Sequence, residues 1–265
     1  MTTPPATPLD LAHARMTAAP EDDAARLRYY EALADADLVL WLDAEAEGEA
    51  LSPRLVELDD GPVVLAYDLE DRLAEAAGVA VAYAALPGRV IAAQLAGQGV
   101  ALGVNLGTEA PAFLVPPQAL EWLAGVLDRS PAQTQARPVE FRAPGALPPA
   151  LVDLLAQKLA RAGGLAQGAL LAGVSYDDGR RGHMLAFVGA PDASQAPLAR
   201  MAAEALAFSG VEAGEMDVAF LTADDPATAV MARVARAFDM PAPQVALAPA
   251  PQAPGMDPDR PPRLR

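Results

Sequence analysis

Residues 79–106 have the sequence VAVAYAALPGRVIAAQLAGQGVALGVNL, which predicts a strand, a helix and a second strand in succession. The apolar run Val79–Leu86 has the length and β-branched content of a strand. Pro87 and Gly88 then begin a helical pattern that ends near Ala96, and Val100–Leu106 forms a further apolar run. Because alternating strands and helices are typical of α/β domains, this stretch predicts that class.

The same alternation extends outward through residues 1–129. The turn sequence Asp59–Pro62 separates two apolar runs and predicts a β-hairpin. Helices are expected over 9–18, 20–34, 68–77, 87–96 and 116–128, and strands over 38–42, 55–58, 63–67, 79–86, 100–106 and 112–115. Together these elements predict an N-terminal α/β domain with a mixed sheet over residues 1–129.

The second half of the chain has an element order of its own. Strands are expected over 139–142, 166–176, 183–188 and 216–221, and helices over 148–162, 196–208 and 227–237. The order βαββαβ predicts a ferredoxin-like α+β domain over residues 139–240. Residues 130–138 have the polar, proline-containing composition of a linker, and residues 241–265 contain eight prolines and are expected to form a flexible tail.

Charge and composition exclude several classes of function. The net charge is −16, and residues 1–129 account for most of it with 21 acidic and 7 basic side chains. A polyanion of this kind is not expected to bind nucleic acid or an anionic membrane surface. The chain contains no cysteine, which excludes disulfides, thiol nucleophiles and cysteine-ligated metals. The first ten residues lack the pattern of a signal peptide, so a cytoplasmic protein is expected.

The motifs that usually carry chemistry are absent or incomplete. The acidic stretch Asp43–Glu49 resembles the start of a calcium loop, but its twelfth position is Arg54 rather than glutamate. No serine lies in a G-x-S-x-G motif, and no phosphate-binding G-x-x-x-x-G-K-S/T sequence occurs. His13 and His183 are the only histidines, one in each half. We therefore predict no catalytic residues, no metal site and no cofactor.

Four side chains are candidates for ligand or partner binding. Arg180 and Arg181 follow Asp178-Gly179 in a predicted hairpin, where they could hold a phosphate or carboxylate. Arg89 stands at the start of a predicted helix, against the helix dipole, and Tyr83 lies on the preceding strand. Since Arg and Tyr are frequent in interface hot spots, we predict that this corner contacts a protein partner.

Several segments together resemble the SseB family, named for enhanced serine sensitivity. They span residues 9–127 and comprise Pro20–Leu33, Tyr83–Arg89, Gly97–Gly107 and Phe113–Gln118. Residues 139–240, with Gly182–Gly189 and Asp217–Leu221, are similar to the C-terminal domain of that family. The resemblance implies a cytoplasmic bacterial protein, often of two domains, and brings no established catalytic residues.

Two classes of function fit these observations. The first is a non-enzymatic binding or regulatory protein whose acidic N-terminal domain docks a partner with a basic or mixed surface. The alternative is a hydrolase-like enzyme that uses carboxylates, with or without a metal. Its acidic residues would be Asp59, Asp60, Asp68, Glu70 and Asp71. The sequence identifies neither the ligand nor the oligomeric state.

Overall fold

The computed structural model describes residues 6–45, 51–128, 136–145, 147–209 and 216–241. Its helices are α1 (Pro8–Ala18), α2 (Asp23–Asp35), α3 (Glu70–Ala77), α4 (Gly88–Leu95), α5 (Pro117–Leu127), α6 (Pro149–Arg161), α7 (Asp192–Ala207) and α8 (Pro226–Ala232). Its strands are β1 (Asp37–Trp41), β2 (Leu55–Leu58), β3 (Gly61–Tyr67), β4 (Tyr83–Pro87), β5 (Ala101–Val104), β6 (Phe113–Val115), β7 (Pro138–Arg142), β8 (Gly168–Tyr176), β9 (Arg181–Val188), β10 (Met216–Leu221) and β11 (Arg236–Asp239). The predicted α/β class is confirmed, with two mixed sheets, each bordered by its own helices.

The N-terminal sheet has the strand order β4-β1-β3-β5-β6, and β2 pairs with the start of β3. β3 and β5 run parallel, while the other pairs are antiparallel. The predicted hairpin is confirmed, because Leu58 pairs with Gly61, whose φ of 118° favours glycine. Along β1, Leu38 and Leu40 join the core that includes α2, α4 and α5, whereas Val39 faces the opposite side with Leu73 of α3.

Gly88 lets α4 begin directly against the end of α2. A Cβ atom at this position would lie 1.9 Å from the carbonyl oxygen of Leu33. The Gly88 N–H also donates a hydrogen bond to the Ala36 carbonyl at 2.8 Å. Close backbone approach therefore explains why glycine follows proline in the Leu86–Arg89 corner.

Replacing Gly88 with alanine is expected to lower the free energy of unfolding by about 3 kcal/mol, because α2 and α4 must separate to admit the methyl group. Gly125→Ala is the matched control, since a Cβ at Gly125 on α5 meets no atom within 4 Å. That substitution should stabilise the protein by about 0.5–1 kcal/mol through helix propensity. Urea denaturation followed by circular dichroism measures both changes, and equal effects would contradict the packing argument.

The C-terminal sheet has the order β10-β9-β8-β11, and β7 also pairs with β8. The ferredoxin-like topology predicted for residues 139–240 is wrong, although the order βαββαβ is observed. In that fold another strand separates the parallel strands of each βαβ unit, whereas here β9 and β10 are parallel neighbours. The predicted helix over 227–237 is also too long. Its last residues form β11, which pairs with Gly168–Leu171 along the part of β8 that β7 leaves free.

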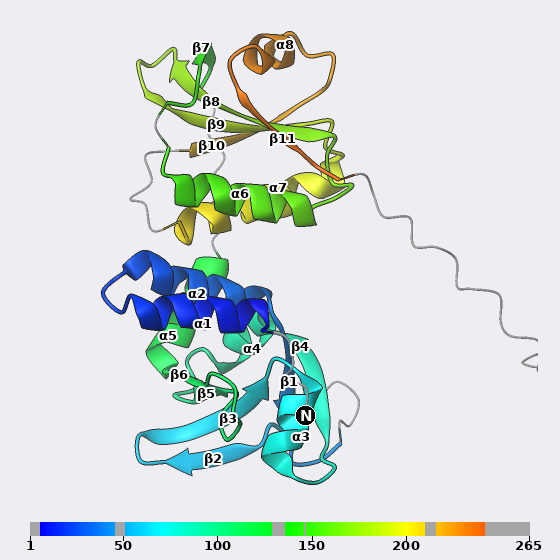
Figure 1. The fold of residues 1–265 in the computed structure, drawn as a ribbon. Helices are drawn as coiled ribbons and strands as arrows, with labels where there is room; N and C mark the ends of the chain where they lie inside the picture. The colour runs from blue at the N-terminus through cyan, green and yellow to red at the C-terminus, as the bar shows by residue number, and fades with distance from the viewer. Residues whose placement is uncertain (1–5, 46–50, 129–135, 146, 210–215, 242–265) are drawn as a thin grey trace, which may run out of the picture.

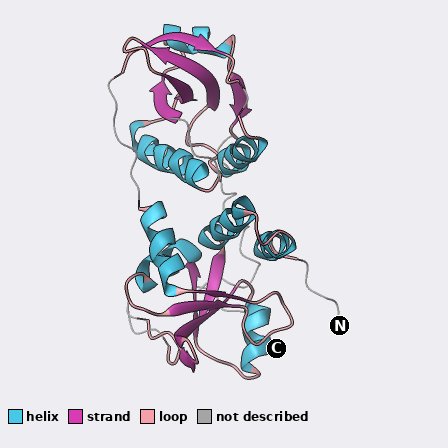
Figure 2. Ribbon diagram, turned by 90° about the vertical axis from the view of Figure 1, so that its left-hand side faces the viewer, coloured by secondary structure: helices cyan, strands magenta, loops and turns pink. Residues whose placement is uncertain are grey.

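The two sheets lie at opposite ends of the molecule, and most of the helices are packed between them (Figures 1 and 2). α3 and α8 are the exceptions, because each covers the outer face of its sheet. One apolar cluster runs through both helical layers. At its edge, Trp122 of α5, which is 39% exposed, contacts Tyr30 and Phe208, with ring centroids 5.5 and 6.1 Å away. The two parts therefore share a packed junction.

The predicted domain limits of 129 and 139 stay a prediction. Most of the predicted linker, residues 130–138, and the predicted tail after Pro241 lie outside the described residues. Within the described part of the chain, no helix has both the length and the apolar character that crossing a bilayer requires.

Candidate functional site

A group of charged side chains with a buried centre joins the two parts of the protein, and we call it the junction cluster. Its members are Glu31 and Asp35 of α2, Arg89 of α4, Lys158 and Arg161 of α6, and Glu204 of α7. Lys158 is the only lysine in the chain. Its Nζ lies 3.3 Å from Glu31, 3.3 Å from Asp35 and 3.5 Å from Glu204. An ammonium group has three N–H donors, so each can be directed at one carboxylate.

Arginines complete the cluster at its edge. The Arg89 guanidinium donates hydrogen bonds to Asp35 at 2.6 Å and to Glu204 at 3.0 Å. Arg161, on the solvent side, donates to Asp35 at 3.0 Å. Asp35 therefore balances the charge of three cations. Arg89, which belongs to the N-terminal part, links it to the C-terminal part through its hydrogen bond to Glu204.

Burial changes the proton affinities in this cluster. Desolvation raises the pKa of the Glu31 carboxyl, against the lowering effect of Lys158 and Arg28. For Arg89, burial favours a lower pKa, but hydrogen bonds and charges from Glu204 and Asp35 raise it. Mutual compensation of charge thus holds the buried members, Glu31, Lys158 and Glu204, while Arg89 and Arg161 remain partly solvated.

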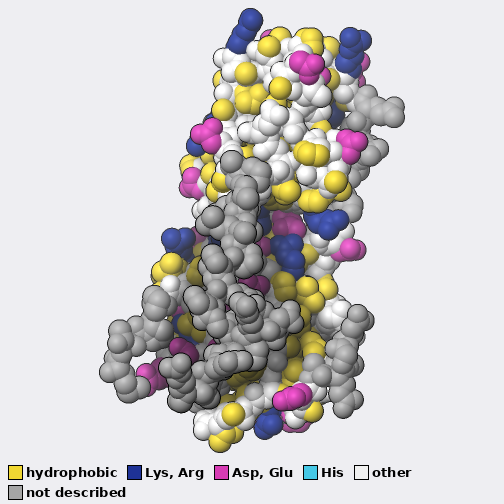
Figure 3. All heavy atoms as spheres, turned by 90° about the vertical axis from the view of Figure 1, so that its right-hand side faces the viewer, with side chains coloured by type: hydrophobic (Ala, Val, Ile, Leu, Met, Phe, Trp, Pro, Cys, Tyr) yellow, Lys and Arg dark blue, Asp and Glu magenta, His cyan; other side chains and the backbone are white. Residues whose placement is uncertain are grey.

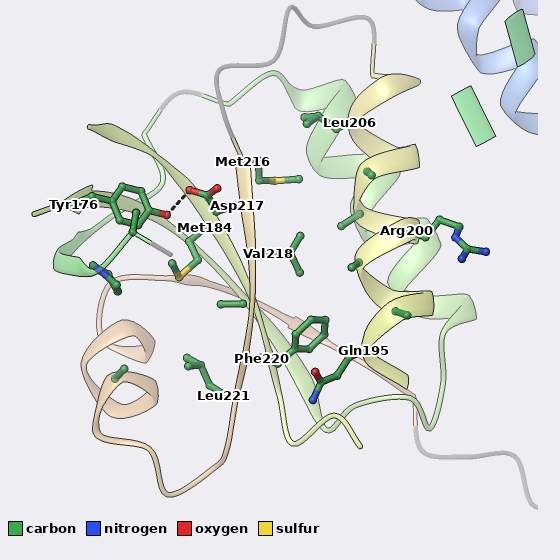
Figure 4. Close-up of a pocket in the computed structure, with 18 of the residues that line it drawn as sticks. Tyr176, Met184, Gln195, Arg200, Leu206, Met216, Asp217, Val218, Phe220 and Leu221 are labelled. Atoms are coloured by element: carbon green, nitrogen blue, oxygen red, sulfur yellow. Dashed lines mark hydrogen bonds between the residues drawn. The ribbon is translucent and has the colours of Figure 1, made fainter. Parts of the chain in front are cut away.

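A cavity of about 950 Å³ lies along β10, the last strand of the C-terminal sheet (Figure 4). Met216, Val218 and Phe220 point from β10 toward α7, whereas Asp217 and Leu221 point to the other side of the sheet. All six residues of β10 are partly exposed. This pattern is typical of an edge strand, whose outer N–H and C=O groups have no neighbouring strand among the described residues.

A polar group lies at one end of this cavity. The Tyr176 hydroxyl donates a hydrogen bond to the Asp217 carboxylate, and the Arg180 guanidinium contacts that carboxylate at 3.2 Å. Arg180 also stacks on the Tyr176 ring, 4.3 Å from its centroid. Desolvation, together with the hydrogen bond and charge of Asp217, raises the pKa of Tyr176. Tyr176 is therefore a neutral donor near pH 7, and the group can bind polar atoms of a ligand.

A second buried ion cluster ties α1 to α3. Both terminal nitrogens of Arg72 contact the Asp10 carboxylate, at 2.9 and 2.6 Å, and one also contacts Asp68 at 2.6 Å. Burial favours a raised pKa for Asp10, but hydrogen bonds from Arg72 and Thr7 lower it overall. Asp68 pairs with Arg72, and α3 begins after Leu69 without a side-chain cap.

The four predicted binding residues do not gather in one site. Tyr83 is exposed on β4, and the charge and hydrogen bond of Glu70 raise its pKa. Arg89 lies in the junction cluster, Arg180 lines the β10 cavity, and Arg181 is exposed at the start of β9. The structure therefore does not bring Tyr83 and Arg89 into one exposed anchor site. Their binding roles stay predictions.

The junction cluster was missed from sequence, although one signal pointed to it. Leu151, Leu154 and Leu155 place an apolar stripe on α6, and Lys158 continues that stripe. A lone lysine at a buried helical position requires an acidic partner. Glu31, Asp35 and Glu204, however, come from helices far apart in the sequence, so no local pattern identified them.

The residues proposed for the enzymatic alternative lie at the two ends of β3, because Asp59 and Asp60 precede the strand and Asp68, Glu70 and Asp71 follow it. Asp59 and Asp60 lie at the exposed turn between β2 and β3, whereas Asp68 is paired with Arg72. In the described ranges, no group of three or more His, Asp or Glu residues is arranged to hold a metal ion. His13 packs edge-on against Tyr29 and Phe113, and His183 contacts the Pro144 carbonyl at 2.6 Å through Nε2.

The fold and these sites define a class of protein: a two-part α/β protein with a charged junction and an open strand edge. Residues 11–122 match the family model of the SseB protein N-terminal domain. This match agrees with the resemblance of residues 9–127 to the SseB family. Neither the curated proteins nor the solved structures provide a match to the chain. The similarity of residues 139–240 to the C-terminal domain of the family stays a prediction.

Proposed function

We propose that this protein is a non-enzymatic binding protein of the SseB type that recruits a partner protein through the free edge of β10. The observation that carries the proposal is the 950 Å³ cavity along that edge. An edge strand offers a row of backbone donors and acceptors to an incoming extended segment. Main-chain hydrogen bonds then supply affinity, and side-chain pockets supply specificity.

The residues that line the cavity indicate which side chains the bound segment would carry. Between β10 and α7 it is apolar, with Leu206, Met216, Val218 and Phe220 directed into it (Figure 4). A segment in extended conformation presents every second side chain to one face. The proposed ligand is therefore a β-strand-like segment with apolar residues at alternate positions, and with a polar group that meets Asp217 and Arg180.

The charge distribution supports a protein partner of basic or mixed surface. Residues 1–129 carry 21 acidic and 7 basic side chains, whereas residues 130–240 carry 12 and 9. The acidic N-terminal part would accelerate association with a basic partner, while the nearly neutral C-terminal part holds the strand edge. A cytoplasmic location belongs to the same proposal, and the lack of cysteine is compatible with it.

Selection of peptides from a displayed random library against the full-length protein tests this proposal. Peptides that bind the wild type should bind Val218→Lys at least about tenfold more weakly, because a lysine on an edge strand opposes strand addition. Val230→Lys is the matched control, since Val230 is exposed on α8 and does not line the cavity. Circular dichroism verifies that both variants fold. The proposal fails if the library yields no binder, or if the selected peptides bind Val218→Lys as well as the wild type.

A further inference from the structure

We infer that a pocket at the junction between the two parts binds a small organic anion with a phosphate or carboxylate head group. The pocket has a volume of about 390 Å³, within the range of small-molecule sites. Asp35 and Arg89 come from the N-terminal part, and the remaining lining residues come from α6, α7 and the residue that follows α6. Ligand sites are frequent at such boundaries.

Cations outnumber carboxylates in the lining of this pocket. Its positively charged residues are Arg89, Lys158, Arg161 and Arg200, and its negatively charged residues are Asp35 and Glu204. The lining therefore carries a formal charge of +2, and Glu31, which lies 3.3 Å from Lys158 behind the lining, reduces this excess to +1, in a chain whose net charge is −16. Figure 3 shows basic and acidic side chains gathered at the waist between the two parts, on the face that looks to the right in Figure 1.

Two of the four cationic side chains have N–H donors that are not used within the pocket. Arg161 is 62% exposed and contacts only Asp35 among the described residues. No hydrogen bond or ion pair within the described part of the chain engages the side chain of Arg200. Figure 4 shows that the Arg200 guanidinium points away from the β10 cavity, to the other side of α7. Guanidinium groups match phosphate and carboxylate oxygens in planar, two-bond geometry.

The carboxylates of the pocket do not neutralise its excess of positive charge. Asp35 already accepts from Arg89, Lys158 and Arg161, and Glu204 accepts from Arg89 and Lys158. An anion between Arg161 and Arg200 would supply the missing negative charge. Ala162, Pro197 and Met201 form the apolar part of the lining and can contact a short carbon skeleton. The expected ligand is thus a small organic anion rather than a nucleic acid.

Binding at this pocket would couple the two parts of the protein. An anion held by Arg161 and Arg200 that also contacts Arg89 of α4 would favour the arrangement in which α2 and α4 pack against α6 and α7. A ligand that binds only this arrangement stabilises it in proportion to its concentration and affinity. The junction would then respond to the concentration of a metabolite.

Isothermal titration calorimetry of the full chain tests the inference with two probes, inorganic phosphate and succinate, at constant ionic strength. We expect saturable binding of at least one probe with one site per chain. The double variant Arg161→Gln/Arg200→Gln should weaken it at least tenfold, because each lost charged hydrogen bond costs about a factor of ten or more. Arg233→Gln, an exposed arginine on the far side of the C-terminal sheet, should bind as the wild type does.

Each possible result of the titration either supports the inference or overturns it. Saturation by phosphate alone, or by succinate alone, supports the site and identifies its head group. Equal affinity of the double variant and the wild type overturns the inference, as does a lack of saturable binding of either probe to the wild type. Circular dichroism and the fluorescence of Trp122, which lies at the junction, show whether each variant retains the native packing.

Discussion

Lys158→Ala is expected to lower the free energy of unfolding by about 3–5 kcal/mol, one of the two largest effects that we predict for a single substitution. The side chain is 5% exposed and faces Glu31, Asp35 and Glu204. Removing the cation at the centre of a buried ion group leaves its carboxylates desolvated and less compensated, because Arg28, Arg89 and Arg161 contact them only from the edge, which is the reason for the large cost. Urea denaturation followed by circular dichroism gives the stability, and tryptophan fluorescence, to which Trp41 and Trp122 both contribute, also follows the packing around Trp122 at the junction.

Arg161→Ala is the matched control for Lys158, because it lies on the same helix and contacts the same Asp35 from an exposed position. It should cost less than about 1 kcal/mol, as exposed ion pairs do. Adding Glu204→Gln to Lys158→Ala should recover part of the loss, because it removes one of the uncompensated charges. If Lys158→Ala and Arg161→Ala have equal effects, the junction cluster is not the buried charge network described above.

Arg72→Ala is expected to have an effect of similar size in the N-terminal part, about 3–5 kcal/mol at neutral pH. Arg72 compensates Asp10 and Asp68, whose side chains are 9% and 3% exposed. The pKa of Asp10 is lowered from 3.8 in the folded protein. A lowered carboxyl pKa contributes stability above the unfolded value, and this contribution is lost as the pH falls through the folded value. The difference between wild type and variant should therefore shrink at pH values below about 4.

Thermal denaturation at pH 7 and at acidic pH measures this dependence. Arg26→Ala serves as the control, because Arg26 forms an ion pair with Asp23 in which both side chains are exposed. It should change the stability by less than about 1 kcal/mol at either pH. A loss in Arg72→Ala that is the same at both pH values would show that packing, rather than charge compensation, explains the role of Arg72.

Local patterns in the sequence were sufficient to predict most of the secondary structure. The helix predicted over 87–96 forms α4 close to its predicted limits, because proline, glycine and apolar periodicity act within a few residues. The strand predicted over Val79–Leu86 is shorter than expected, since β4 begins only at Tyr83. The hairpin at Asp59–Pro62 was predictable for the same reason. The α/β class and the resemblance of residues 9–127 to the SseB family also followed from the sequence, and the family match over residues 11–122 confirms the latter.

The order of the C-terminal strands and the composition of both sites depend on contacts between distant residues. Arg236–Asp239 became a strand because β8 had a free edge beside it, which no local pattern shows. Arg89 looks like an exposed helix-start arginine in the sequence, yet Asp35 and Glu204, 54 and 115 positions away, hold it at the junction. Lys158 acquires its three carboxylates in the same way. Local sequence determines backbone conformation because its interactions span one or two turns, whereas burial, pairing and charge compensation depend on which helices and strands become neighbours when the chain folds.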